Sequence, residues 1–156
     1  MSLDQLPQGD LHLLDHPVAQ QLLESAIPAR LGYIAPDSTP RVTPIWFTWN
    51  GTEFVFGAAG ASPKVRALRA NPAVAVTVDS EKPPYSILLV RGRAEIEIVE
   101  GAVDEYAESA LRYLGPTQGA RFRDHAKATF NGMARITVKP EWVGLIDFQT
   151  RYPSTY

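Results

Sequence analysis

The chain has 156 residues, of which 45% are hydrophobic and 21% charged, so it is long enough to bury a core in one domain. Its formal net charge of -2 argues against the basic surface that binding to nucleic acid or anionic membranes requires. The absence of cysteine excludes disulfides and thiolate chemistry. No apolar run approaches the roughly 20 residues of a membrane span, and no signal-peptide pattern is present. We therefore expect a cytoplasmic protein that binds neither nucleic acid nor membranes.

The first forty residues predict one helix and the first strand. Residues 1–10 are polar, and we expect them to form a flexible tail. The apolar spacing within residues 18–23 predicts a short amphipathic helix. Residues 30–35 alternate as a strand, and the turn residues 36–39 should connect this strand to the next one in a hairpin.

The segment that follows predicts a second hairpin. Residues 41–49 are rich in β-branched and aromatic side chains, which favour a strand. Asn50-Gly51 is a strong signal for a two-residue turn, because both turn positions need a positive φ. Residues 53–57 then return as a second strand, and large side chains disappear over residues 57–61.

A helix start with an unusual charge comes directly after this loop. Ser62 is a favourable N-cap, and Pro63 suits the first helical position. Lys64 places a cation in the first turn, where the helix dipole favours an anion. Free N–H groups at a helix start bind phosphate. We therefore expect Ser62, Lys64 and the backbone amides to hold a phosphate group.

The second half of the chain predicts two more strands, then two helices. Residues 73–79 and 86–99 have the composition and alternation of strands. Residues 102–114 and 118–129 have helical spacing, and Gly115-Pro116 should separate the two helices.

The end of the chain predicts two final strands. Residues 133–138 form the first, Pro140-Glu141 should break it, and residues 142–148 form the second. Residues 150–156 should be a flexible tail. The whole pattern predicts a mainly β (α+β) fold, an antiparallel barrel of about six to seven strands with peripheral helices.

The order of these elements resembles the flavin-binding split β-barrel superfamily of pyridoxamine 5'-phosphate oxidase-like proteins, which includes deazaflavin-dependent reductases. The resemblance rests on residues 41–47, the Asn50-Gly51 turn, residues 62–74 and residues 90–94. It extends over most of the chain, from about residue 30 to residue 148. The chain lacks the extended arginine-rich phosphate motif of the true oxidase, which argues against vitamin B6 oxidation.

The resemblance implies that residues 1–156 form a single flavin-binding split-barrel domain and that two copies form a homodimer with cofactor sites at the interface. The ring of the cofactor would lie along residues 41–46, Ala58 and Ala59 would pass close to it, and the partner subunit would supply Trp142. The implied cofactor-binding residues are Arg41, Val42, Thr43, Pro44, Trp46, Ala58, Ala59, Ser62, Lys64 and Trp142.

These features favour an FMN-dependent oxidoreductase that transfers hydride or electrons to or from a small molecule. The flavin would carry the chemistry, so no catalytic side chain is expected. One alternative keeps the fold and replaces FMN by the deazaflavin coenzyme F-420, whose longer acidic tail Arg66 or Arg69 could meet. A second is a non-catalytic flavin- or haem-binding module, with His125 as the candidate axial ligand. A third is a cofactor-free β-barrel that binds another protein. The three histidines lack metal-ligand spacing, so no metal is expected.

Overall fold

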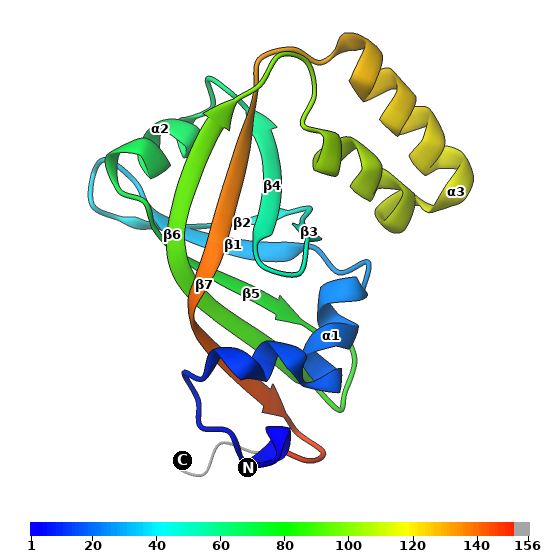
Figure 1. Ribbon diagram of the computed structural model, residues 1–156. Helices are drawn as coiled ribbons and strands as arrows, with labels where there is room; N and C mark the ends of the chain where they lie inside the picture. Colours follow the sequence, from blue (N-terminus) through cyan, green and yellow to red (C-terminus); the bar gives the residue numbers. More distant parts are fainter. Residues whose placement is uncertain (152–156) are drawn as a thin grey trace.

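The computed structural model describes residues 1–151, which form one antiparallel seven-stranded sheet with the strand order β2-β1-β5-β6-β7-β4-β3 (Figure 1). The strands are β1 (Ala29–Ile34), β2 (Pro40–Ile45), β3 (Thr48–Trp49), β4 (Phe54–Ala59), β5 (Ala73–Asp79), β6 (Ser86–Ile98) and β7 (Met133–Asp147). The helices are α1 (Pro17–Glu24), α2 (Pro63–Ala70) and α3 (Asp104–Thr129), with short 3-10 helices η1 (Leu3–Gln5) and η2 (Leu11–Asp15). The sheet curls into a half-barrel with the helices around it, which confirms the predicted fold class.

The core lies inside the curl of the sheet. Alternate residues of β5 and β6 point inward, so that Val76 of β5 and its partner Val90 of β6 are both 1% exposed. The strand period of two puts the intervening residues on the outer face. Helices α1 and α2 lie at different ends of the curled sheet, and α3 lies beside β4 (Figure 1).

The predicted strand over residues 41–49 is divided in the structure, so that prediction was wrong in extent. Its first part is β2, which pairs with β1 at one edge of the sheet, and its last part is β3, which pairs with β4 at the other edge. Trp46 and Phe47 lie between the two and leave the ladder because the chain crosses from one edge to the other there. Phe47 is 1% exposed, so the crossover covers part of the core.

The predicted break at Pro140-Glu141 was also wrong. The chain continues through it as the single long strand β7. Gly92 of β6 pairs with Pro140 and Arg91 pairs with Trp142, which leaves Glu141 without a partner in β6. A β-bulge of this kind inserts one extra residue and bends the strand, and it is one of the few places where a sheet tolerates proline.

Two helical halves fold back on each other in α3, as the Gly115-Pro116 pair predicts (Figure 1). Gly115 has φ 82° and ψ 175°, a backbone conformation that interrupts the helix. Glu108 in the first half forms ion pairs with Lys127 at 2.5 Å and Arg123 at 3.9 Å in the second half. None of the helices within residues 1–151 is long and apolar enough to span a membrane.

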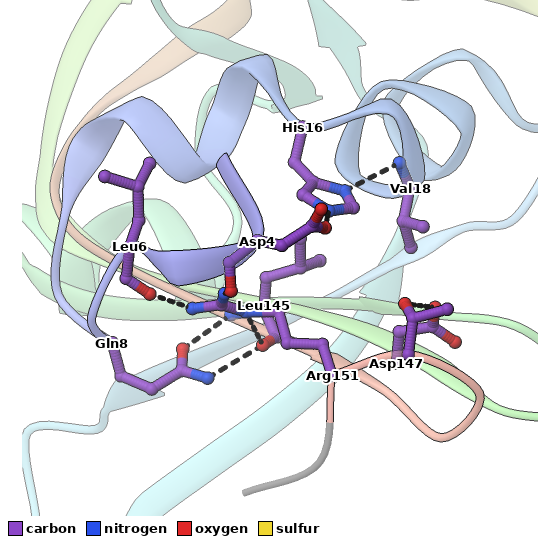
Figure 2. A network of polar contacts seen from close by, with 9 residues as sticks. Asp4, Leu6, Gln8, His16, Val18, Leu145, Asp147 and Arg151 are labelled. Carbon is purple, nitrogen blue, oxygen red and sulfur yellow. Dashed lines mark hydrogen bonds and ion pairs between the residues drawn. The ribbon is translucent and has the colours of Figure 1, made fainter. Parts of the chain in front are cut away.

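The first ten residues, for which the sequence predicts a flexible tail, lie against β7 in the structure. The N–H of Gly9 donates to the carbonyl of Val143 at 2.7 Å, and the Gln8 side chain exchanges two hydrogen bonds with the backbone of Leu145. Arg151, in the predicted C-terminal tail, is 9% exposed and contacts the same segment (Figure 2). The remainder of that tail, residues 152–156, lies outside the described residues.

Gly60 allows the loop between β4 and α2 to pass close to the chain before β7. A Cβ atom at Gly60 would lie 2.2 Å from the carbonyl oxygen of Gly132. We expect Gly60→Ala to destabilise the protein by about 1–3 kcal/mol, because a backbone oxygen has little room to move. Gly32→Ala is the control, since its Cβ would meet its nearest atom at 3.5 Å. Chemical denaturation of both variants measures the difference, and equal stabilities would contradict the prediction.

Candidate functional site

The start of α2 presents a cation without a counter-ion. Ser62 Oγ accepts a hydrogen bond from the N–H of Val65 at 3.4 Å, and Pro63 occupies the first turn, which confirms the predicted N-cap. Lys64 is half-buried, and its Nζ makes no hydrogen bond or ion pair with any residue in 1–151. Burial lowers the pKa of Lys64 because it penalises the charged form. A half-buried ammonium of this kind is stabilised by an anion.

The rest of α2 adds two further cations, Arg66 in its first half and Arg69 in its last turn. Arg66 donates to the carbonyl of Ala61 at 2.7 Å, and Arg69 is exposed. Neither arginine has a carboxylate partner among the described residues. Val65 and Leu68 are each 1% exposed and fix the helix against the barrel. The buried face therefore holds the helix in place while its cations remain available for a ligand.

A groove lies where the crossover between β2 and β3 meets the middle of β4. It has a volume of about 370 Å³ and is lined by Pro28, Pro44, Ile45, Trp46, Gly57 and Tyr106. The curl of the sheet thus brings the end of β2, at one edge, against β4 near the other edge. Gly57 is joined through Ala58 and Ala59 to the loop before α2, so small residues connect the groove to Lys64 along the chain.

Trp46 forms one wall of this groove and is held by three aromatic rings of α3. It stacks on Tyr113 with ring centroids 4.9 Å apart and planes 6° apart. Tyr106 and Phe122 contact it at centroid distances of 5.8 Å and 5.5 Å. Aromatic pairs in such geometries are favourable beyond their buried area. The family resemblance suggests Trp46 as a cofactor contact, and the structure places it both in the groove and in this cluster.

The backbone next to Trp46 is held by two neighbouring residues of α3. The N–H of Phe47 donates to Tyr113 Oη at 3.2 Å, and the Arg112 guanidinium donates to the Phe47 carbonyl. Tyr113 Oη also donates to the carbonyl of Ile27 at 3.3 Å. Both polar groups of Phe47 are thereby satisfied outside the sheet. The two residues fix the crossover that carries Trp46.

An ion pair with two hydrogen bonds to one carboxylate oxygen holds α3 over the sheet. Arg135 of β7 donates to Glu105 Oε1 from Nε at 2.9 Å and from a terminal nitrogen at 2.7 Å. The hydrogen bonds from Arg135 lower the pKa of Glu105. Hydrogen bonds between charged groups are roughly twice as strong as those between neutral groups. The first half of α3, which carries Tyr106, is therefore held against β7 and β4.

The other predicted cofactor-binding residues of β2 are Arg41, Val42 and Thr43. Strand β2 forms one edge of the sheet, and β3 forms the other edge. Arg41 forms an ion pair with Asp37 at 3.2 Å within the hairpin turn, and Val42 is 71% exposed. Both line a second hollow of about 500 Å³. Thr43 is half-buried, whereas Pro44 reaches the groove described above.

Trp142 lies on β7, outside the residues that line the groove. The Arg91 guanidinium sits over its ring at 3.9 Å, a cation–π arrangement. Of the two alanines, Ala58 packs against the core and Ala59 is exposed. Within one chain the predicted residues therefore fall into separate groups at α2, at the groove, on β2 and on β7.

Sequence reasoning missed three residues of α3 that shape the groove: Tyr106, Arg112 and Tyr113. The helical spacing of residues 102–114 predicts only that Tyr106 packs on the apolar face of a helix. Tyr106 and Tyr113 are seven residues apart and so share a helical face, which is the signal that was present. Nothing in the sequence tells which strand that face covers.

The residues present fit a phosphate-bearing cofactor better than a metal or haem. The described residues contain no group of three or more metal-ligating side chains. His125 is exposed on α3, bonds Thr129 and lines none of the hollows described above. Lys64, by contrast, is a half-buried cation with no partner of its own within residues 1–151.

Comparisons with known proteins give a consistent result. A family model described as pyridoxamine 5'-phosphate oxidase matches residues 16–147. A solved F420 reductase is 31% identical, with a TM-score of 0.59, over 80% of this chain and 94% of that chain. Protein Rv2991 of Mycobacterium tuberculosis has a TM-score of 0.71 at 20% identity, over 87% of this chain and 88% of that chain. HutZ, a heme storage protein of Vibrio cholerae, has a TM-score of 0.61 at 16% identity, over 85% and 93%. No curated protein matches in sequence.

Proposed function

Because the chain belongs to the pyridoxamine 5'-phosphate oxidase family, we propose that it is a cytoplasmic oxidoreductase that binds a deazaflavin or flavin cofactor and acts on a small molecule. The observation that carries the proposal is the half-buried, unpartnered Lys64 beside the capped start of α2. Of the two cofactors, the deazaflavin coenzyme F-420 is favoured by the 31% identity to an F420 reductase. FMN, the first choice from sequence alone, has the same ring outline and a phosphate, and is the second candidate.

The residues of the chain would divide the work of holding such a cofactor. Lys64, Ser62 and the first amides of α2 would hold the phosphate. The small side chains of Ala58 and Ala59 would leave room for the ring, and Trp46 would lie beside it. The bound ring supplies the hydride or electron transfer itself. The longer tail of coenzyme F-420 would extend toward Arg66 and Arg69.

We further propose that the site is completed in a homodimer, with Trp142 contributed by the partner copy. Within one chain Trp142 lies apart from both the groove and α2, although it carries a large apolar ring on the outer face of the sheet. Likeness to HutZ at 16% identity supports the fold alone, so a haem-storage role is not proposed.

Titration of the purified protein with coenzyme F-420 and, in parallel, with FMN tests the proposal. We expect both to bind, with coenzyme F-420 the tighter, because three cations of α2 can meet its acidic tail. Fluorescence of the cofactor gives the two dissociation constants. Tighter binding of FMN would reassign the cofactor and keep the redox function. Binding of neither would overturn the proposal.

A further inference from the structure

Two residues that line the groove carry a hydrogen-bond donor for which the described part of the chain provides no acceptor. Tyr106 Oη and Trp46 Nε1 both belong to residues that line the groove, and neither atom forms a hydrogen bond within residues 1–151. The only side-chain nitrogen or oxygen in that part of the chain that is both buried and unpartnered is Arg112 Nε. Neither donor atom is therefore fully buried, and both belong to residues that line the groove.

The remaining lining of the groove carries no charge. It consists of Pro28, Pro44, Ile45 and Gly57, so it offers apolar surface and no side-chain acceptor. A volume of about 370 Å³ lies at the small end of the range for small-molecule sites. An ionised group would lose its hydration here without gaining a counter-charge from the lining. The groove therefore suits a compact, uncharged molecule.

Both donors are held in place by their surroundings. A Cβ atom at Gly57 would lie 2.6 Å from Tyr106 Cβ, so the tyrosine rests directly on the strand. Trp46 is fixed by its stacking on Tyr113. Burial raises the pKa of the Tyr106 phenol, so the hydroxyl stays protonated at neutral pH and can donate. Donors that are already ordered bind an acceptor at lower entropic cost.

We propose that the groove binds the substrate, an uncharged planar molecule, through a carbonyl-type oxygen that accepts hydrogen bonds from Tyr106 Oη and Trp46 Nε1. This assignment rests on the proposed function: the cofactor ring would lie along Ala58 and Ala59, and the substrate would lie next to it in the groove at Gly57. Tyr106 is then the specificity-determining residue that separates carbonyl compounds from hydrocarbons of the same shape. A site built to hydrogen-bond a ligand rejects the analogue that cannot do so, because its polar groups are left unpaired.

Binding of three matched probes to the protein without added cofactor tests the proposal. The probes are 2-acetylnaphthalene, 2-ethylnaphthalene and 2-naphthoate, which differ in the carbonyl and in charge. We expect 2-acetylnaphthalene to bind about 3- to 10-fold more tightly than 2-ethylnaphthalene in isothermal titration calorimetry, the range for one or two neutral hydrogen bonds. Equal binding of these two, tighter binding of 2-naphthoate, or no binding of any probe would overturn the proposal.

The variant Tyr106→Phe identifies the donor. It keeps the ring and its packing, so we expect the preference for 2-acetylnaphthalene to shrink toward 1-fold while the affinity for 2-ethylnaphthalene is unchanged. Tyr85→Phe, at an exposed tyrosine outside the groove, is the control and should keep the full preference.

A preference that persists in Tyr106→Phe would remove the assignment to Tyr106. So would a loss of coenzyme F-420 affinity with the probe preference intact, because the groove would then hold the cofactor ring. If only the cofactor titration fails, the proposed function is contradicted. The binding of the three probes then still tests the groove separately.

Discussion

Replacing Lys64 by methionine is expected to weaken binding of coenzyme F-420 by about 10- to 100-fold. This loss of affinity corresponds to the loss of one hydrogen bond to a charged group, which contributes about 1.5–3 kcal/mol. Methionine keeps most of the length of the side chain and its packing, so the change removes the charge and little else. Ser62 and the amides of α2 would remain, which is why binding is weakened and not abolished.

The same variant is expected to unfold at an equal or higher temperature when no cofactor is bound. Burial lowers the pKa of Lys64 from its ordinary value of 10.5. Between the lowered pKa and 10.5 the unfolded chain binds more protons than the folded chain, so stability rises with pH in that window. Below the lowered pKa the penalty for the buried charge is present in full. Methionine is uncharged and has no such penalty. In the wild type, a bound anion would offset the penalty for the buried charge of Lys64.

Two measurements check this pair of effects. Cofactor titration gives the affinity, and thermal unfolding without cofactor gives the stability. Lys82→Met is the control because Lys82 is exposed in the loop before β6. In the wild type, affinity should also fall as the pH rises through the pKa of Lys64, since the neutral amine no longer pairs with phosphate. Affinity that is unchanged in Lys64→Met would remove Lys64 from the phosphate site.

The start of α2 could be predicted because its signals are local. An N-cap serine, a proline in the first turn and a cation in the wrong half of the helix dipole lie within three consecutive residues, Ser62 to Lys64. Their geometry depends on one turn of backbone and not on the rest of the fold. The structure accordingly confirms the cap and leaves the cation without a partner among residues 1–151.

The groove could not be predicted, because it depends on contacts between distant segments. Trp46 and Tyr106 are 60 residues apart, and they meet only where the β2–β3 crossover packs against α3. Local patterns instead predict an uninterrupted strand over residues 41–49. The error at Pro140 has a similar origin, since a bulge is specified by the register with β6 and not by the proline alone.

The variant Arg151→Met is expected to lower the free energy of unfolding by about 2–4 kcal/mol, because it removes the hydrogen bonds that a buried guanidinium donates to three backbone carbonyls. The Arg151 guanidinium donates to the carbonyl of Leu145 at 3.1 Å, to that of Asp4 at 2.6 Å and to that of Leu6 (Figure 2). These bonds tie the first residues of the chain to the end of β7. Chemical denaturation measures the loss, and Arg121→Met, at an exposed position on α3, is the control.

Loss of these bonds should also release the N-terminal segment from β7. Hydrogen exchange at the N–H of Gly9, which donates to Val143, is expected to accelerate more than exchange in the centre of β7. A Cβ at Gly9 would lie 2.9 Å from Trp142 Nε1, so this segment packs directly on the residue proposed to complete the partner's site. If Trp142 completes the cofactor site of the partner subunit, release of the N-terminal segment should therefore weaken cofactor binding. If Trp142 does not contribute to that site, cofactor binding should be unchanged. Unchanged stability together with unchanged exchange at Gly9 would show that the hydrogen bonds of Gln8 and Gly9 hold the segment without Arg151.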